Sequence, residues 1–298
     1  MRETRVRAVR HVALNVPNVE RSSSFLEKSW GLTPMGEGHE FRGAWDGRPL
    51  IKLSEQRARG IDHISFAAAS QADVDSMAER VRSAGLRLEL EPHSGDDGEY
   101  SMRCRDGHGL MIEVAHAEPR RAVPTRCQPF FDPPMLISHV VLNTPDLEAT
   151  SALYCELFGF EVSDRAGSSM NFLRCNEYHH SLAFSRAEHT SLNHVAFEVG
   201  SIDSVIRNTV RLKGEGREAL WGPGRHGPGD NVFAYFSDPN GLLFEYTSGL
   251  EIFDDDDPRE ARVWSLEDPE AVNSWGTGPP SADAACAMLG EPDPFLRP

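Results

Sequence analysis

The chain carries two copies of one sequence pattern, and this internal repeat constrains its fold more than any other feature. Three pairs of segments match one another at offsets that grow from 128 to 132 residues: HVALNVP (11–17) with HVVLNTP (139–145), DHISF (62–66) with NHVAF (193–197), and DGHGLMIE (106–113) with DPNGLLFE (238–245). Because the offset grows slowly, the copies differ by short insertions in their loops. Such a repeat predicts two modules of one design.

The limits of the repeat divide the 298 residues into four parts. We predict a first module at 1–118, a linker rich in Arg and Pro at 119–135, a second module at 136–250, and a tail at 251–298. The tail has an acidic run and many prolines. Its Trp264 and Trp275 would be unusual in a disordered segment, so we expect the tail to pack on the rest of the protein.

Each copy alternates signals for strands and helices. A short apolar run that begins at the repeated His has the character of a strand, and a helical segment follows it. In the second copy, Pro145 suits the first turn of this helix and Gly159 suits its end. Another helix is predicted around residues 201–213, and a hairpin with its turn at 238–241 closes the copy. The order is β-α-β-β-β taken twice, which predicts an α+β fold rich in strands.

Composition argues against several kinds of partner and location. The formal charge is −16, from 30 Lys and Arg against 46 Asp and Glu, so neither a nucleic acid nor an anionic membrane surface is expected as the main partner. No apolar run approaches the roughly 18 residues of a membrane-spanning helix, and the first residues lead into no signal-peptide core. The five Cys are odd in number and form no CxxC pair, which favours reduced thiols and the cytoplasm.

Two histidines and a glutamate stand out among the repeated residues of the second copy. His139 and His194 lie near the starts of two predicted strands, Glu245 lies on a late strand, and apolar residues flank all three. A buried carboxylate needs a cation, a donor or a proton, so any one of the three alone is more often a satisfied core group. Together, two imidazoles and one carboxylate form the facial ligand set of non-haem Fe(II) sites, which leaves three positions open on the metal. Mn(II) accepts the same ligands and is the alternative metal.

Several motifs of the second copy are similar to those of one enzyme family. They are GRH (224–226), YFSDPNG (235–241), the terminal Glu245, and HHSLAF (179–184), which precedes His194. With these motifs the chain resembles the type I extradiol ring-cleaving dioxygenases of the vicinal oxygen chelate superfamily. One departure is Ala234, where the family usually has a larger side chain before the Tyr. The resemblance in architecture covers both modules, whereas the specific motifs lie in residues 137–247.

This resemblance implies a fold of two tandem modules, each built from paired βαβββ motifs. It implies that the two histidines and the glutamate named above hold Fe(II) in the second module. It also implies His180 as the acid and base beside the metal, a task that suits an imidazole near neutral pH, with His226 and Tyr235 completing the pocket. The reaction would be the cleavage of a catechol by O2, beside the two hydroxyl groups rather than between them.

For three residues in or near these motifs, the sequence allows both a functional and a purely structural interpretation. His179 is either functional or merely exposed, and we expect it to point away from the pocket, because successive side chains of a strand point to opposite faces. Trp221 faces an uncharged ring or alkyl substituent of the substrate, or else it is a packing residue. Arg225 either contacts an anionic substituent or has no part in binding.

The first copy carries a matching set of potential ligands. His11, His63 and Glu113 align with the three proposed ligands, so a second metal site is conceivable. However, the first copy has Arg103 where the second has Tyr235, and it shows no counterpart of the paired histidines. In the family that the chain resembles, the amino-terminal module is usually a non-catalytic duplicate. We therefore predict that the first module holds no metal.

Other functions remain open for the same fold. One is a metal-dependent isomerase or epimerase of the glyoxalase type, which would not need His180, His226 and Tyr235 together. Another is a non-catalytic module that binds a small ligand, and a third is a structural protein whose His and Glu are satisfied in the core. For the dioxygenase we expect a catecholic small molecule and O2 as partners, and a homo-oligomer as the assembly.

Overall fold

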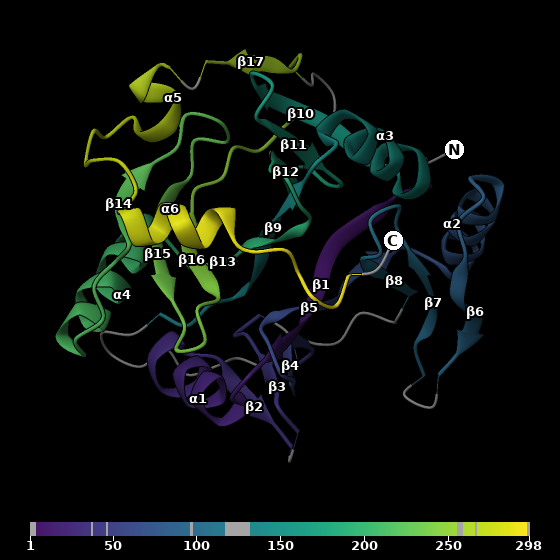
Figure 1. The fold of residues 1–298 in the computed structure, drawn as a ribbon, viewed down its shortest axis with the longest axis horizontal. Coiled ribbons are helices and arrows are strands. Elements are labelled where there is room, and N and C mark those ends of the chain that lie inside the picture. The colour runs from purple at the N-terminus through teal and green to yellow at the C-terminus, as the bar shows by residue number, and fades with distance from the viewer. Residues whose placement is uncertain are drawn as a thin grey trace.

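Two β-sheets, one from each half of the chain, form the body of the protein. The computed structural model describes residues 4–36, 38–45, 47–95, 98–116, 132–254, 259–265 and 267–296. In Figure 1 the first half, purple to blue, lies beside the second half, teal to yellow. Most of the predicted linker, residues 119–131, lies outside the described residues.

The first half contains two successive βαβββ units that share one eight-stranded sheet. Their elements are β1 (Val6–Val16), α1 (Val19–Ser24), the π-helical turn η1 (Phe25–Trp30), β2 (Thr33–Met35), β3 (Glu40–Arg42), β4 (Pro49–Glu55), β5 (Gly60–Ala68), α2 (Gln71–Ser83), β6 (Leu88–Ser94), β7 (Tyr100–Arg105) and β8 (Met111–His116). The strand order is β2-β3-β4-β1-β5-β8-β7-β6, so the first strands of the two units pair antiparallel at the centre.

The second half repeats this design and adds the tail. Its elements are β9 (Leu136–Thr144), α3 (Leu147–Phe158), β10 (Glu161–Ala166), β11 (Met170–Arg174), β12 (Leu182–Arg186), β13 (Ser191–Glu198), α4 (Ile202–Gly214), β14 (Trp221–Arg225), β15 (Val232–Ser237), β16 (Leu243–Ser248), and in the tail β17 (Arg262–Trp264), α5 (Pro269–Asn273) and α6 (Ala282–Leu289). The strand order is β14-β15-β16-β13-β9-β12-β11-β10-β17. The predicted α+β class, with paired βαβββ motifs in each of two tandem modules, is confirmed.

Local sequence signals explain where α3 begins and ends. The Asp146 side chain accepts a hydrogen bond from the Ala149 backbone N–H at 3.2 Å, which satisfies one of the free donors of the first turn. Gly159 ends the helix in the left-handed region at φ 72°, as predicted. Pro145 lies before the cap rather than in the first turn, so the helix begins slightly later than the proline suggested.

Aromatic side chains interlock the two halves. Trp30, at the end of η1, stacks on Tyr246 of β16 with ring centroids 3.7 Å apart, and its carbonyl accepts a hydrogen bond from the Tyr246 hydroxyl at 2.7 Å. In the other direction, Phe158 of α3 packs 6.3 Å from Phe66 of β5. All four side chains are fully buried, and each contributes roughly 2 kcal/mol through burial. Each half therefore supplies part of the core of the other.

The tail packs on the second half. Strand β17 extends the second sheet beside β10, and the Trp264 indole N–H donates to Asp164 at 2.7 Å. Helix α6 is held by Asn143, which donates to the carbonyls of Met288 and Leu289 at 2.8 and 2.9 Å. The expectation holds for Trp264, whereas Trp275 is 42% exposed. In the described part of the chain, every helix is too short or too polar to cross a bilayer.

A partly buried glutamate at the end of β13, Glu198, predicts a pH dependence of stability. Burial, together with the nearby Glu245, raises the pKa of Glu198 to about 7, although a hydrogen bond from Ser248 opposes this shift. A folded pKa above the unfolded one means that the protonated form favours folding, so this contribution is complete below about pH 4.5 and is lost as the pH rises towards 7. We expect Glu198→Gln to raise the free energy of unfolding of the metal-free protein by ~2 kcal/mol at pH 8 and by little at pH 4.5.

Urea unfolding at the two pH values measures this effect. Glu20→Gln is the matched control, because the Glu20 side chain is 81% exposed. An equal gain for Glu198→Gln at both pH values would contradict the prediction.

Candidate active site

Three adjacent strands of the second sheet bring His139, His194 and Glu245 together. Strands β9, β13 and β16 are neighbours, and Ala196 of β13 pairs with His139 on one side and with Glu245 on the other. Residues paired across strands point to the same face, and His194 lies two residues before Ala196, so its side chain also points there. The sheet therefore gathers on one face three residues that are far apart in the sequence.

The potential ligand atoms lie close enough to share an ion. Glu245 Oε2 is 3.4 Å from His139 Nε2 and 3.2 Å from His194 Nε2, and one ligand atom of each residue lies within 4.8 Å of the others. All three residues are buried. Burial raises the pKa of Glu245, but the two neighbouring imidazoles outweigh it and hold this pKa well below its usual range. Glu245 is therefore a carboxylate at neutral pH.

Two buried atoms of this group make no hydrogen bond within the described part of the chain: His194 Nε2 and Glu245 Oε2. The second polar atom of each of these two side chains does form a hydrogen bond. The Asn193 side-chain oxygen accepts from His194 Nδ1 at 2.8 Å, and Asn231 donates to Glu245 Oε1 at 3.1 Å. Because its proton is on Nδ1, His194 turns a bare Nε2 towards the carboxylate, as a metal ligand requires. The donor set thus fits a divalent cation such as Fe(II) or Mn(II).

An apolar cavity of about 210 Å³ opens beside two of these residues, His139 and His194. Its lining consists of His139, Val141, Ala166, Met170, Phe172, His180, Ser185, Asn193, His194, Trp221, His226, Pro228, Asn231, Tyr235, Ala271, Val272, Met288 and Leu289. None of these described lining residues carries a carboxylate, ammonium or guanidinium group. A dry cavity of about 150 Å³ holds benzene, so this one has room for a single aromatic ring with small substituents.

His226 and Tyr235 form a hydrogen-bonded pair in the cavity wall. His226 Nδ1 donates to the carbonyl of Val272 in the tail at 2.9 Å, and its bare Nε2 accepts from the Tyr235 hydroxyl at 3.2 Å. Burial lowers the pKa of His226 to about 4, so the ring is neutral at pH 7. Burial and the charge of Glu245 raise the pKa of Tyr235 well above its usual value. The pair therefore offers a neutral hydroxyl, backed by a neutral imidazole, to a bound ligand.

His180 also lines the cavity, with its ring centroid 4.2 Å from that of His139. The structure corrects the local interpretation, because residues 179 and 180 belong to the connection between β11 and β12 rather than to a strand. Both rings are buried, and their Nδ1 atoms lie 2.9 Å apart. Only His180 is among the residues that line the cavity, as expected, but strand alternation is not the reason.

The structure places Trp221 and Arg225 differently with respect to the cavity. Trp221 lines the cavity and stacks on Tyr235, with ring centroids 5.4 Å apart and planes at 16°. Arg225 instead binds Asp230 in its own loop, with nitrogen–oxygen distances of 2.8 and 2.6 Å, and it is not part of the lining. A contact of Arg225 with a substrate substituent is therefore not favoured.

The sequence analysis did not identify the residues that orient His194, Glu245 and His226, which are Asn193, Asn231 and Val272. Asn193 could have been found from the repeat, because the first copy has Asp62 at the matching position, and the Asp62 carboxylate binds His63 Nδ1 at 2.7 Å. Asn231 follows a loop without periodicity, and Val272 acts through its backbone carbonyl. Neither leaves a signal in the sequence.

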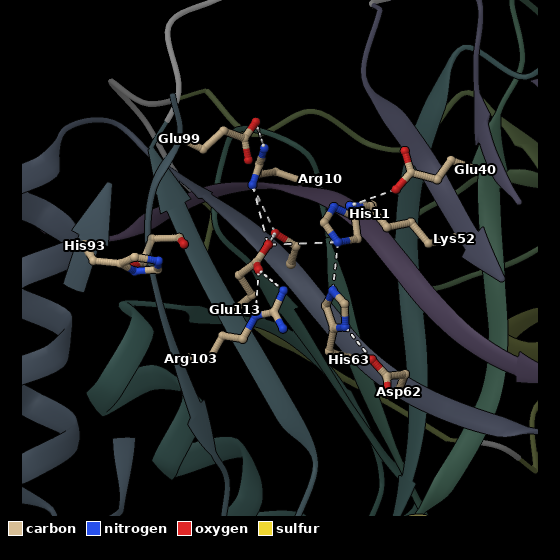
Figure 2. A network of polar contacts seen from close by, with 12 residues as sticks. Arg10, His11, Glu40, Lys52, Asp62, His63, His93, Glu99, Arg103 and Glu113 are labelled. Carbon is tan, nitrogen blue, oxygen red and sulfur yellow. Dashed lines mark hydrogen bonds and ion pairs between the residues drawn. The ribbon is translucent and has the colours of Figure 1, made fainter. Parts of the chain in front are cut away.

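In the first half, the glutamate of the matching set, Glu113, is paired with Arg10 and Arg103, as Figure 2 shows. Glu113 accepts from Arg103 at 2.8 and 2.7 Å and from Ser65 at 2.7 Å, so both of its oxygens are engaged. His11 and His63 face each other with their Nε2 atoms 2.8 Å apart, which requires a proton between them. The ligand atoms do approach one another closely enough for an ion. However, the Arg103 guanidinium already supplies the positive charge that a metal would bring.

We accordingly expect His63→Ala to leave metal binding and turnover nearly unchanged. Metal analysis should find one ion per chain in both the wild type and the variant, because we expect the ion at His139, His194 and Glu245 of the second half. Oxygen uptake should change by less than about twofold. A loss of half of the bound metal would show instead that the first module is loaded.

Known proteins resemble this chain along most of its length. A family model described as the Glyoxalase/Bleomycin resistance protein/Dioxygenase superfamily matches residues 8–114 and 136–246. Metapyrocatechase 2 of Cupriavidus necator is 25% identical over 92% of this chain and 90% of its own length. Biphenyl-2,3-diol 1,2-dioxygenase of Paraburkholderia xenovorans (strain LB400) is 26% identical over 91% and 95%. The crystal structure of a Mn(II)-bound glyoxalase from Novosphingobium aromaticivorans matches with a TM-score of 0.89 and 34% identity, covering 98% of this chain and 97% of that one.

Proposed function

The chain belongs to the Glyoxalase/Bleomycin resistance protein/Dioxygenase superfamily, and from this premise we propose that it is an extradiol dioxygenase that cleaves a catechol with O2. The metal is held by His139, His194 and Glu245. The observation that carries the proposal is the convergence of these ligand atoms beside an apolar cavity with room for one aromatic ring. Two of the ligand atoms have no hydrogen-bond partner among the described residues.

A divalent cation held by these three residues would supply Lewis-acid chemistry to a bound diol and to O2. Side chains of the protein accept and donate the protons of the reaction. A diol hydroxyl donates to the Tyr235 oxygen while Tyr235 donates to His226 Nε2, and the Nδ1–H of His226 continues to donate to the Val272 carbonyl. The proton released by the diol thus reaches an imidazole without passing through water.

His180 acts at another side of the ring as the second acid and base. Its position 4.2 Å from the His139 ring puts it beside the proposed metal ligands and inside the cavity. Burial and the neighbouring imidazoles lower the pKa of His180 well below its usual value, so the ring starts as a neutral base. An imidazole can accept a proton and return it, which the opening of an aromatic ring requires as oxygen-bound charge forms and disappears. The apolar walls strengthen these interactions because they exclude water.

The cavity favours an uncharged monocyclic catechol. Its described lining provides no cation for a carboxylate substituent, and Arg225 is bound to Asp230. Trp221, Met170 and Phe172 offer apolar surface to an alkyl or similar group. At about 210 Å³ the space suits one ring better than two.

Iron is the proposed metal and manganese the alternative. Two imidazoles and one carboxylate bind either ion, so the ligand set does not discriminate. The similarity to a structure that contains Mn(II) keeps manganese in the proposal. The proposal also includes a homo-oligomer and the cytoplasm, where Cys104, Cys155, Cys175 and Cys286 would stay free, as they are in the structure.

A glyoxalase-type isomerase is the second candidate, because one similar structure is described as a glyoxalase. Such chemistry needs the metal ligands but not the cluster of His180, His226 and Tyr235 in the same cavity. We therefore favour the dioxygenase.

The test loads the purified protein with Fe(II) or Mn(II) under anaerobic conditions and then adds O2 with a panel of catechols. Uptake of one O2 per catechol, together with a yellow ring-opened product, is the expected result. Catechols with a carboxylate substituent should react at least tenfold less efficiently than alkyl catechols. Isomerisation of a dicarbonyl–thiol adduct without catechol cleavage would favour the second candidate, and tight catechol binding without turnover would indicate a binding protein.

A further inference from the structure

A chain of hydrogen bonds leads from His180 into the protein, away from the cavity. His180 Nδ1 lies 2.9 Å from Nδ1 of His179, and His179 Nε2 lies 3.0 Å from Asp164 Oδ2. His179 and Asp164 are 0% exposed, and His180 is 3% exposed. The proposed function assigns no role to His179 or Asp164. Their arrangement resembles a relay in which one residue acts through the next.

Asp164 is a fixed anion at the inner end of this chain. Arg259 donates to both of its oxygens at 2.8 and 3.1 Å, and the Trp264 indole N–H donates to Oδ2 at 2.7 Å. Burial raises the pKa of Asp164, but hydrogen bonds from His179, Arg259 and Trp264 prevail and hold this pKa well below its usual range. Since a carboxylate can only accept, the proton between Asp164 and His179 belongs to His179 Nε2.

The positions of the remaining protons follow from this anchor. Arg259 pairs with Asp164 and also with the partly exposed Glu251. A cation in the His179 ring, which is 0% exposed, would be costly to bury, so we take this ring to be neutral. A neutral His179 with its proton on Nε2 has a bare Nδ1, which must accept. The proton between the two histidines therefore belongs to His180 Nδ1.

We propose that His179 is a positioning residue that, anchored by Asp164, fixes His180 as the tautomer with a bare Nε2 available to the cavity. The tail takes part, because Arg259 and Trp264 hold the anchor. His226 is oriented in the same way by a different device, the Val272 carbonyl. His180 and His226 then each present an unprotonated Nε2 to the cavity and can accept a proton as a substrate arrives. The catalytic consequence rests on the proposed function, whereas the tautomer itself does not.

Nitrogen-15 NMR of the metal-free, histidine-labelled protein tests the tautomer directly. The chemical shifts and one-bond couplings should show a protonated Nδ1 and a bare Nε2 for His180 in the wild type. In His179→Phe, which removes the acceptor, His180 should lose this preference. His93→Phe is the matched control, because His93 is exposed on the first half. A wild-type His180 that carries its proton on Nε2 would overturn the proposal.

Kinetics of the metal-loaded protein test the consequence. His179→Phe should lower kcat by ~10- to 100-fold with KM changed by less than about threefold and metal content unchanged, because substrate and metal contacts remain. His179→Asn, whose side-chain oxygen lies near the position of Nδ1 and can accept from His180, should recover most of the rate. Full activity of His179→Phe would overturn the inference. A wild type that cleaves no catechol would instead overturn the proposed function and leave the NMR result to decide this one.

Discussion

Replacing His194 by Ala will abolish metal binding and catechol cleavage together. His194 Nε2 lies 3.2 Å from Glu245 Oε2, and both atoms are buried without a hydrogen-bond partner among the described residues. Removing the imidazole leaves two potential ligands, His139 and the Glu245 carboxylate, and this carboxylate loses one of its two neighbouring imidazoles. We expect less than about 0.1 metal ion per chain and a rate lower by a factor on the order of 10³ or more, since the metal contributes several kcal/mol to the transition state.

Metal analysis after anaerobic loading and desalting, paired with oxygen uptake, measures this effect. His63→Ala is the matched control, because His63 occupies the aligned position in the first half, where Arg103 already neutralises Glu113. The fold should survive in both variants, as circular dichroism can verify. A His194→Ala protein that retains a full equivalent of tightly bound metal would show that the ion lies elsewhere, and the proposed active site would then be wrong.

The repeat explains why so much of the fold was predictable. Two copies that match at their strands must form two similar sheets, and the paired βαβββ motifs followed from the order of local signals. The grouping of His139, His194 and Glu245 could also be anticipated, because matching residues recur in both copies, and in the structure β9, β13 and β16 are adjacent and present these residues on one face. When strands are adjacent in a sheet, residues at matching positions of those strands come together even though they are far apart in the sequence.

The rest depends on contacts that have no period in the sequence. His179 and His180 lie in a connection, so alternation along a strand could not give their directions. The tail reaches the cavity through the backbone carbonyl of Val272, which any residue type can supply. Arg103 is the exception, because its alignment with Tyr235 was visible in the sequence and the structure pairs it with Glu113.

Replacing His180 by Ala will separate metal binding from turnover. The His180 ring lies 4.2 Å from that of His139 but supplies none of the three grouped ligand atoms, so the metal content should equal that of the wild type. Without an acid and base beside the ring, kcat should fall by ~10²- to 10⁴-fold, which is the usual contribution of one such group. KM should change less, because most of the apolar lining remains.

The pattern of rescue distinguishes proton transfer from a structural role of the same side chain. His180→Ala leaves a space the size of an imidazole ring at the cavity wall, next to Phe172 and His139. Added imidazole should enter this space and restore part of the rate in proportion to the concentration of its neutral form. If the His180 ring only supported the cavity wall, the restored rate would not depend on the basicity of the added imidazole. Substituted imidazoles of different pKa values make the comparison quantitative. If His180→Ala turns over catechols at the wild-type rate, then the proton is carried by another group, and the Tyr235–His226 pair is the first to examine.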